Sequence, residues 1–137
     1  MTTRQLRATC KRMAKMIGLG EWSIECIFAT QKELRGRLGK PSWVHYGDSQ
    51  ALNVTEKRAR IRIARQSEIK TTDRQTIETI GHELGHIRFD PSQKLWHNRR
   101  FEAALDDFGK FLADIEEGML IEIRELRIRR KKEPNAK

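Results

Sequence analysis

The spacing of apolar residues divides the chain into segments of helical and extended character. Apolar positions three and four residues apart predict an amphipathic helix over residues 3–17, which Gly18 then ends. Over Trp22–Phe28 apolar residues occupy every second position, which is typical of a half-buried strand. Glycine and proline between residues 36 and 41 then predict a loop.

Two further strands are expected before the middle of the chain. One is predicted around Ser42–Gly47 and the other over Arg58–Ala64, where Ala59, Ile61 and Ile63 alternate with arginines. Together, the three predicted strands indicate a small antiparallel sheet with one face in solvent.

The second half is predicted to form two helices. Thr72 and Gln75 have the spacing of a capping box, and an apolar-periodic stretch runs from there to Phe89, where an Asp-Pro pair ends it. After a loop, apolar residues at helical spacing predict a last helix over residues 101–126.

Gly109 and Gly118 are expected to bend or divide this last helix. No repeat or linker interrupts the sequence. We therefore expect one α+β domain over residues 1–130, in the order helix, sheet, helix, helix, and a basic C-terminal tail over residues 131–137.

Composition adds a strong basic excess, with 28 Lys and Arg against 19 Asp and Glu and a formal net charge of +9. Such a charge favours binding to nucleic acid or to an acidic partner, but the basic residues are scattered and no nucleic-acid reading motif accompanies them.

No apolar run reaches the roughly 18 residues that span a bilayer, and no signal peptide is recognisable, so we expect a cytoplasmic protein without a membrane contact. Cys10 and Cys26 form no Cys-x-x-Cys pair and are expected to be ordinary thiols.

The candidate chemistry lies in the pentapeptide His82-Glu83-Leu84-Gly85-His86. Two histidines four residues apart project from one side of a helix, where both imidazoles can bind one zinc ion while the glutamate reaches a water molecule on it. That glutamate would act as general base for a water that zinc activates.

The helix that carries this motif has an apolar stripe on another face. At about 100° per residue, both histidines fall nearly opposite that stripe. They are therefore either metal ligands or ordinary surface residues. The stripe consists of Ile77, Ile80, Leu84 and Ile87.

A catalytic zinc ion has three protein ligands, so the third must come from elsewhere in the chain. His45 and His97 have the right chemistry, but each stands alone beside aromatic residues. The last helix offers carboxylates instead, at Glu116 and Glu117.

The pentapeptide followed by Glu117-Gly118 resembles the gluzincin pattern, in which a distal glutamate on a second helix completes the zinc site. The short chain is also similar to minimal gluzincin-like peptidases and to metallopeptidase-like proteins of phages and prophages. This resemblance implies a zincin-like fold with His82, His86 and Glu117 as zinc ligands, Glu83 as general base, and a peptide or protein substrate.

Two other glutamates remain alternatives for the third ligand. Glu116 ranks after Glu117, and Glu102 ranks third because it follows His86 closely, although Asp106 beside it resembles a supporting aspartate. An oxyanion could be stabilised by Tyr46, by His97 or by an arginine. The alternative function is a non-catalytic metal-containing regulatory or nucleic-acid-binding protein.

Overall fold

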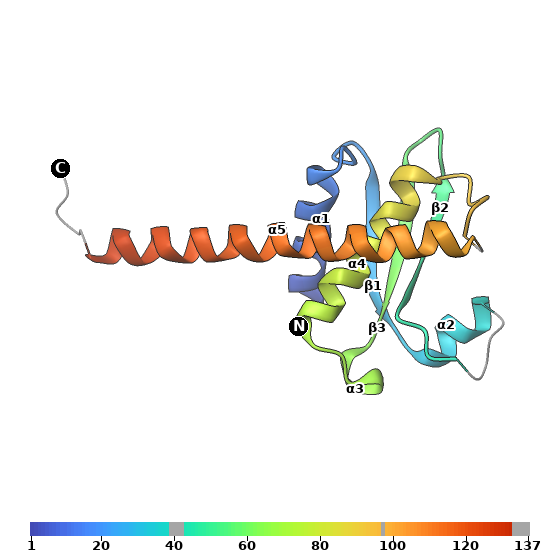
Figure 1. Cartoon of the computed structure of the whole chain (residues 1–137), viewed down its shortest axis with the longest axis horizontal. Helices are drawn as coiled ribbons and strands as arrows, with labels where there is room; N and C mark the ends of the chain where they lie inside the picture. Colours follow the sequence, from blue (N-terminus) through green and yellow to red (C-terminus); the bar gives the residue numbers. More distant parts are fainter. Residues whose placement is uncertain (39–42, 97, 133–137) are drawn as a thin grey trace.

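A three-stranded sheet, two helices on one of its faces and a third helix laid over those two form the body of the protein (Figure 1). The computed structural model describes residues 1–38, 43–96 and 98–132. In chain order the elements are α1 (Thr3–Met16), β1 (Ser23–Ala29), α2 (Gln31–Leu38), β2 (Gly47–Asn53), β3 (Arg58–Ala64), α3 (Gln66–Ile69), α4 (Asp73–Phe89) and α5 (Arg99–Lys132). The mixed α+β class is therefore confirmed.

The sheet is mixed, with the strand order β1-β3-β2. β2 and β3 form an antiparallel pair, but β1 runs parallel to β3, with Ser23 opposite Arg58. The prediction of an antiparallel sheet was wrong for β1. A parallel pair needs a long crossover, and α2 lies in that connection, within a stretch where residues 36–41 were predicted to form a loop.

The second strand begins later than predicted, at Gly47. Trp43 and Tyr46, which lie before it, are 61% and 54% exposed, and residues 43–46 are not in a strand. β2 instead buries the polar residues Asp48 and Ser49. Apolar alternation could not reveal a strand whose buried side chains are polar.

The predicted helices α1 and α4 are confirmed, and both pack on the sheet. The capping box of α4 is formed, because the Thr72 hydroxyl accepts from the Gln75 amide at 3.1 Å while the Gln75 side chain accepts from the Thr72 amide at 2.9 Å. The largest fully buried apolar side chains are Leu6, Met13, Leu34, Ile61, Ile63, Ile80, Leu84 and Leu112.

α5 is one continuous helix, so Gly109 and Gly118 do not divide it. It crosses the body over α4 and then extends far beyond it (Figure 1). Residues 118–131 are all exposed. The first residues of the predicted basic tail belong to this helix, and residues 133–137 lie outside the described part of the chain.

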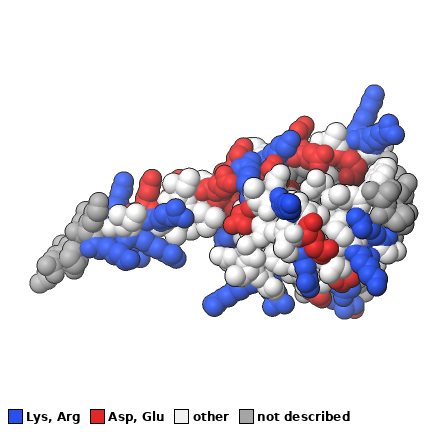
Figure 2. All heavy atoms as spheres, turned by 90° about the horizontal axis from the view of Figure 1, so that it is seen from below, with Lys and Arg blue, Asp and Glu red and all other residues white. Residues whose placement is uncertain are grey.

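Charge is unevenly distributed over this shape. Figure 2 shows Lys and Arg along the projecting part of α5 and a group of Asp and Glu where the helix leaves the body. Among the described helices, none has the length and apolar content to cross a membrane.

Candidate metal centre

The two histidines face the first turns of α5, because α4 and α5 run in opposite directions. Arg74, near the start of α4, pairs with Glu117 near the middle of α5, whereas His86, near the end of α4, pairs with Glu102 at the start of α5. The side chains that face the motif therefore come from the first turns of α5.

A short connection between the helices sets this pairing. The buried Asp90 carboxylate accepts from the amides of Lys94 and Leu95 at 3.0 and 2.7 Å, which fixes the turn after α4. The Asn98 side chain then accepts from the Phe101 amide at 3.0 Å and caps the start of α5. Glu102 consequently lies in the first turn of α5, where the helix dipole favours a carboxylate.

Gly109 allows the helices to approach closely enough for these contacts. A Cβ atom there would lie 2.4 Å from the Glu78 carbonyl oxygen and 3.0 Å from the His82 amide nitrogen. A Cβ on Gly85 would lie 2.6 Å from Leu105. The glycines therefore mark the crossing point of two tightly packed helices.

Three ligand atoms converge between α4 and α5. The Nε2 atoms of His82 and His86 each lie 2.8 Å from a different oxygen of Glu102. One ligand atom from each residue lies within 4.8 Å of the others. This set of two imidazole nitrogens and one carboxylate oxygen could hold a metal ion.

Asp106 supports the cluster from the next turn of α5. Its carboxylate lies 2.7 Å from Nδ1 of His82. A carboxylate on Nδ1 fixes the imidazole orientation and directs Nε2 toward a ligand, as in many metal sites. The ring of Phe101 packs edge-on against His86 at a centroid distance of 5.5 Å.

The carboxylates around His82 favour the protonated form of its imidazole. Burial on its own lowers the pKa of His82, but the hydrogen bond to Glu102 and the charges of Glu83, Glu102 and Asp106 raise it to about 9. For the Glu102 carboxyl, burial acts in the other direction and raises the pKa, but its hydrogen bonds to the two histidines lower the pKa to about 2. A metal ion would replace the protons that these groups share.

Glu83 lies beside the cluster and faces the sheet. Glu83 is 5% exposed, and the Ser49 hydroxyl donates to its Oε1 at 3.2 Å. Burial raises the pKa of Glu83, and the charges of the two histidines oppose this rise. Ser49 was not predicted as a site residue, because β2 lacks the apolar alternation that would have located it.

A cleft of about 600 Å³ opens onto this group. It can admit a ligand to His82, Glu83 and Glu102. His45 and Tyr46 line the same cleft, from the segment before β2. The remaining lining residues are Val44, Gly47, Gln75, Glu78, Thr79, Asp106 and Lys110.

Glu117, the predicted third ligand, does not lie at the two histidines. Its carboxylate pairs with Arg74 at 3.0 Å, at the opposite end of α4. Because an α-helix rises 1.5 Å per residue, Glu117 lies about 22 Å along α5 from Glu102. The structure instead brings together His82, His86 and Glu102, the alternative that the sequence ranked last.

Glu116, the other alternative, is also remote from the histidines. Its fully buried carboxylate accepts from Arg12 Nε at 2.8 Å and joins α5 to α1. His97, a candidate for the third ligand and for the oxyanion, lies outside the described residues.

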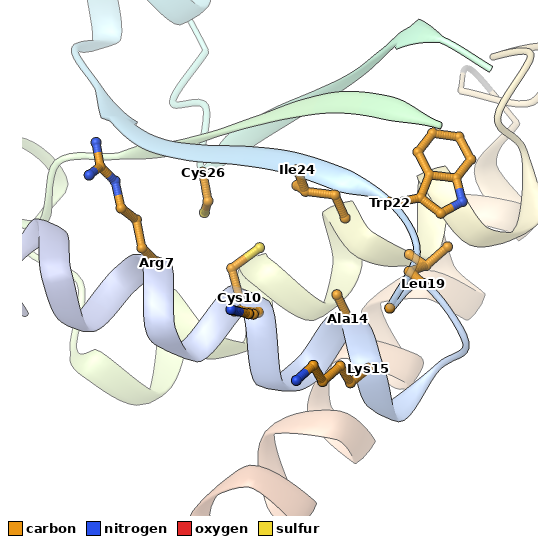
Figure 3. Close-up of a pocket in the computed structure, with 10 residues that line it drawn as sticks. Arg7, Cys10, Ala14, Lys15, Leu19, Trp22, Ile24 and Cys26 are labelled. Carbon is orange, nitrogen blue, oxygen red and sulfur yellow. The ribbon is translucent and has the colours of Figure 1, made fainter. Parts of the chain in front are cut away.

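A second pocket, of about 300 Å³, lies between α1 and β1, away from the histidines (Figure 3). Cys10 and Cys26 line it, and both are buried free thiols. The contact with Cys10, together with burial, raises the pKa of the Cys26 thiol well above its usual range. Carboxylates and imidazoles are absent from the described lining of this pocket, which distinguishes it from the cluster on α4 and α5.

Comparisons of the chain with protein-family models, with curated proteins and with solved structures gave no match.

Proposed function

We propose that the protein is a zinc metallopeptidase in which His82, His86 and Glu102 bind the metal and Glu83 is the general base. The observation that carries this proposal is the convergence of three ligand atoms within 4.8 Å beside a buried glutamate. The arrangement supports a zincin-like interpretation of the two helices, with Glu102 in place of Glu117.

The donor set suits zinc. Catalytic zinc sites commonly have three protein ligands drawn from histidine and carboxylate and leave a position open for water or substrate. Here two nitrogens and one oxygen lie within 4.8 Å of one another, and a cleft reaches His82 and Glu102. Asp106 would hold His82 in the orientation that binding needs.

Each remaining group has a distinct role in hydrolysis. Zinc, when bound, would supply a Lewis acid and lower the pKa of a water molecule. Glu83 would accept a proton through Oε2 and pass it to the leaving amine, while Ser49 holds Oε1. Tyr46 lines the cleft and is the candidate for hydrogen bonding to the substrate carbonyl oxygen.

The test combines metal content with peptide hydrolysis. The wild-type chain should bind one zinc ion per molecule, as measured by elemental analysis, and should cleave members of a degenerate peptide library. Glu83→Gln should retain zinc and lower hydrolysis by about 10²- to 10⁴-fold.

The ligand assignment needs a matched pair of variants on α5. Glu102→Gln should weaken zinc binding by more than the roughly 10- to 100-fold that loss of a supporting residue costs. Glu117→Gln should leave zinc affinity unchanged, because its carboxylate contacts Arg74. Equal zinc affinity in all three proteins would refute the site, whereas zinc binding without any peptide cleavage would refute only the peptidase activity.

A further inference from the structure

The face of α5 that packs on the body continues beyond it. Buried positions follow one another at spacings of four, three and four residues along Leu105, Gly109, Leu112 and Glu116. The same alternation of three and four leads next to Met119, Ile123 and Leu126, which are 40%, 39% and 54% exposed. Spacing of this kind keeps residues on one seam of a helix.

This seam lies on a part of the helix that lacks a neighbour among the described elements. The main contacts of α5 are with α4 and α1, and neither of these helices reaches alongside the projecting segment (Figure 1). A helix of about 15 residues is marginal in water without tertiary packing. Burial of the three apolar side chains Met119, Ile123 and Leu126 against another surface would lower the free energy of the protein in water.

We propose that the seam of Met119, Ile123 and Leu126 binds the same seam of a second copy of this chain, with the two helices antiparallel. Ile123 of one copy would then lie opposite Leu126 of the other. A two-fold axis relates the two copies, so each contact between the seams occurs twice.

Charged residues beside the seam are complementary in this orientation. Glu122 and Arg129 are seven residues apart and flank the seam on the same side. In an antiparallel pair, the same flanks of the two helices meet. With Ile123 opposite Leu126, Glu122 therefore faces Arg129 of the second copy, and the symmetry repeats this ion pair.

The shape and the charge of α5 disfavour a parallel pair. The body of each copy lies toward the same side of α5 as the seam, so a parallel neighbour would run into it. A parallel pair would also place the basic ends, including Arg130 and Lys131, beside each other. An antiparallel pair places each basic end near the part of the other helix that leaves the body, where Figure 2 shows a group of Asp and Glu.

The first test measures mass against concentration for the full chain by sedimentation equilibrium. The wild type should approach twice 16.1 kDa as concentration rises. Ile123→Glu should lower the association constant by at least about 30-fold, because each dimer loses two central apolar side chains. Ile121→Glu is the matched control, since Ile121 is 55% exposed but lies away from the seam, and it should dimerise as the wild type does.

Charge reversal tests the orientation. Glu122→Arg and Arg129→Glu should each weaken the dimer, and the double variant should restore it. Restoration by Glu122→Arg with Arg127→Glu would instead indicate a parallel pair and overturn the proposed orientation. A wild type that stays monomeric at every concentration, or that binds DNA or anionic vesicles only as a monomer, would overturn the proposal itself.

Discussion

Two neighbouring glutamates on α5 have different environments, although the sequence gives them equal chemistry. Glu116 is completely buried against Arg12, whereas the Glu117 side chain is 44% exposed beside Arg74. Adjacent residues on a helix point about 100° apart, so one can face a core and the next can face solvent. The sequence ranked Glu117 before Glu116 as a metal ligand but could not show which of the two is buried, because the neighbouring helix α1 covers Glu116.

The two ion pairs should differ in their effect on stability. Arg12→Ala should reduce the free energy of unfolding by about 3 kcal/mol, because it leaves the Glu116 carboxylate buried without its cation. Arg74→Ala breaks the more exposed pairs with Glu117 and Asp114 and should cost under about 1 kcal/mol. Urea unfolding measures both, and similar losses in the two variants would contradict the assignment of Glu116 as a buried ion-pair partner.

At the scale of elements, the spacing between α4 and α5 determines the candidate centre. His82 and His86 come from one helix and Glu102 and Asp106 from the other, so these side chains meet only while the helices remain at this distance. Gly109 keeps them close, since any side chain there would meet the backbone of α4.

Gly109→Ala should therefore weaken both the fold and the centre. We expect a loss of about 1–3 kcal/mol in unfolding free energy from overpacking, together with weaker zinc binding as Glu102 moves away. Gly118→Ala is the control, because nothing lies within 4 Å of a Cβ there and alanine favours a helix by about 0.5–1 kcal/mol. Denaturation measures the change in unfolding free energy, and zinc titration measures the change in zinc affinity. A Gly109→Ala variant with unchanged zinc affinity would show that close packing at Gly109 does not hold Glu102 at the histidines.

Local signals in the sequence were sufficient for some elements and insufficient for others. The capping box at Thr72 and the apolar periods predicted α1 and α4, because these signals act within a few residues. The parallel pairing of β1 depends on α2, which has no strong apolar face. The position of Glu102 depends on the short connection that Asp90 and Asn98 organise. Because α4 and α5 run in opposite directions, the end of α4 faces the start of α5. A carboxylate soon after His86 in the sequence, such as Glu102, therefore lies at the histidines.

At the scale of the whole molecule, metal binding and folding should be linked. A ligand that binds only the folded state stabilises it by about 2.7 kcal/mol at a hundredfold excess over its dissociation constant. Zinc at that excess should therefore raise the thermal midpoint of the wild type, and a chelator should reverse the rise. Glu102→Gln should show no such gain at the same zinc concentration, and an equal gain in that variant would place the stabilising ion elsewhere.

The helical ligands and the sheet divide the candidate chemistry between two parts of the fold. Glu102 follows His86 by only sixteen positions, and the entropy of closing so short a loop is small. A hairpin of α4 and α5 therefore contains all three candidate ligands, while Ser49, which donates a hydrogen bond to Glu83, belongs to the edge strand β2. Under the proposed function, a mutation of Ser49 should lower turnover and leave metal affinity intact, so that the two properties can be lost independently.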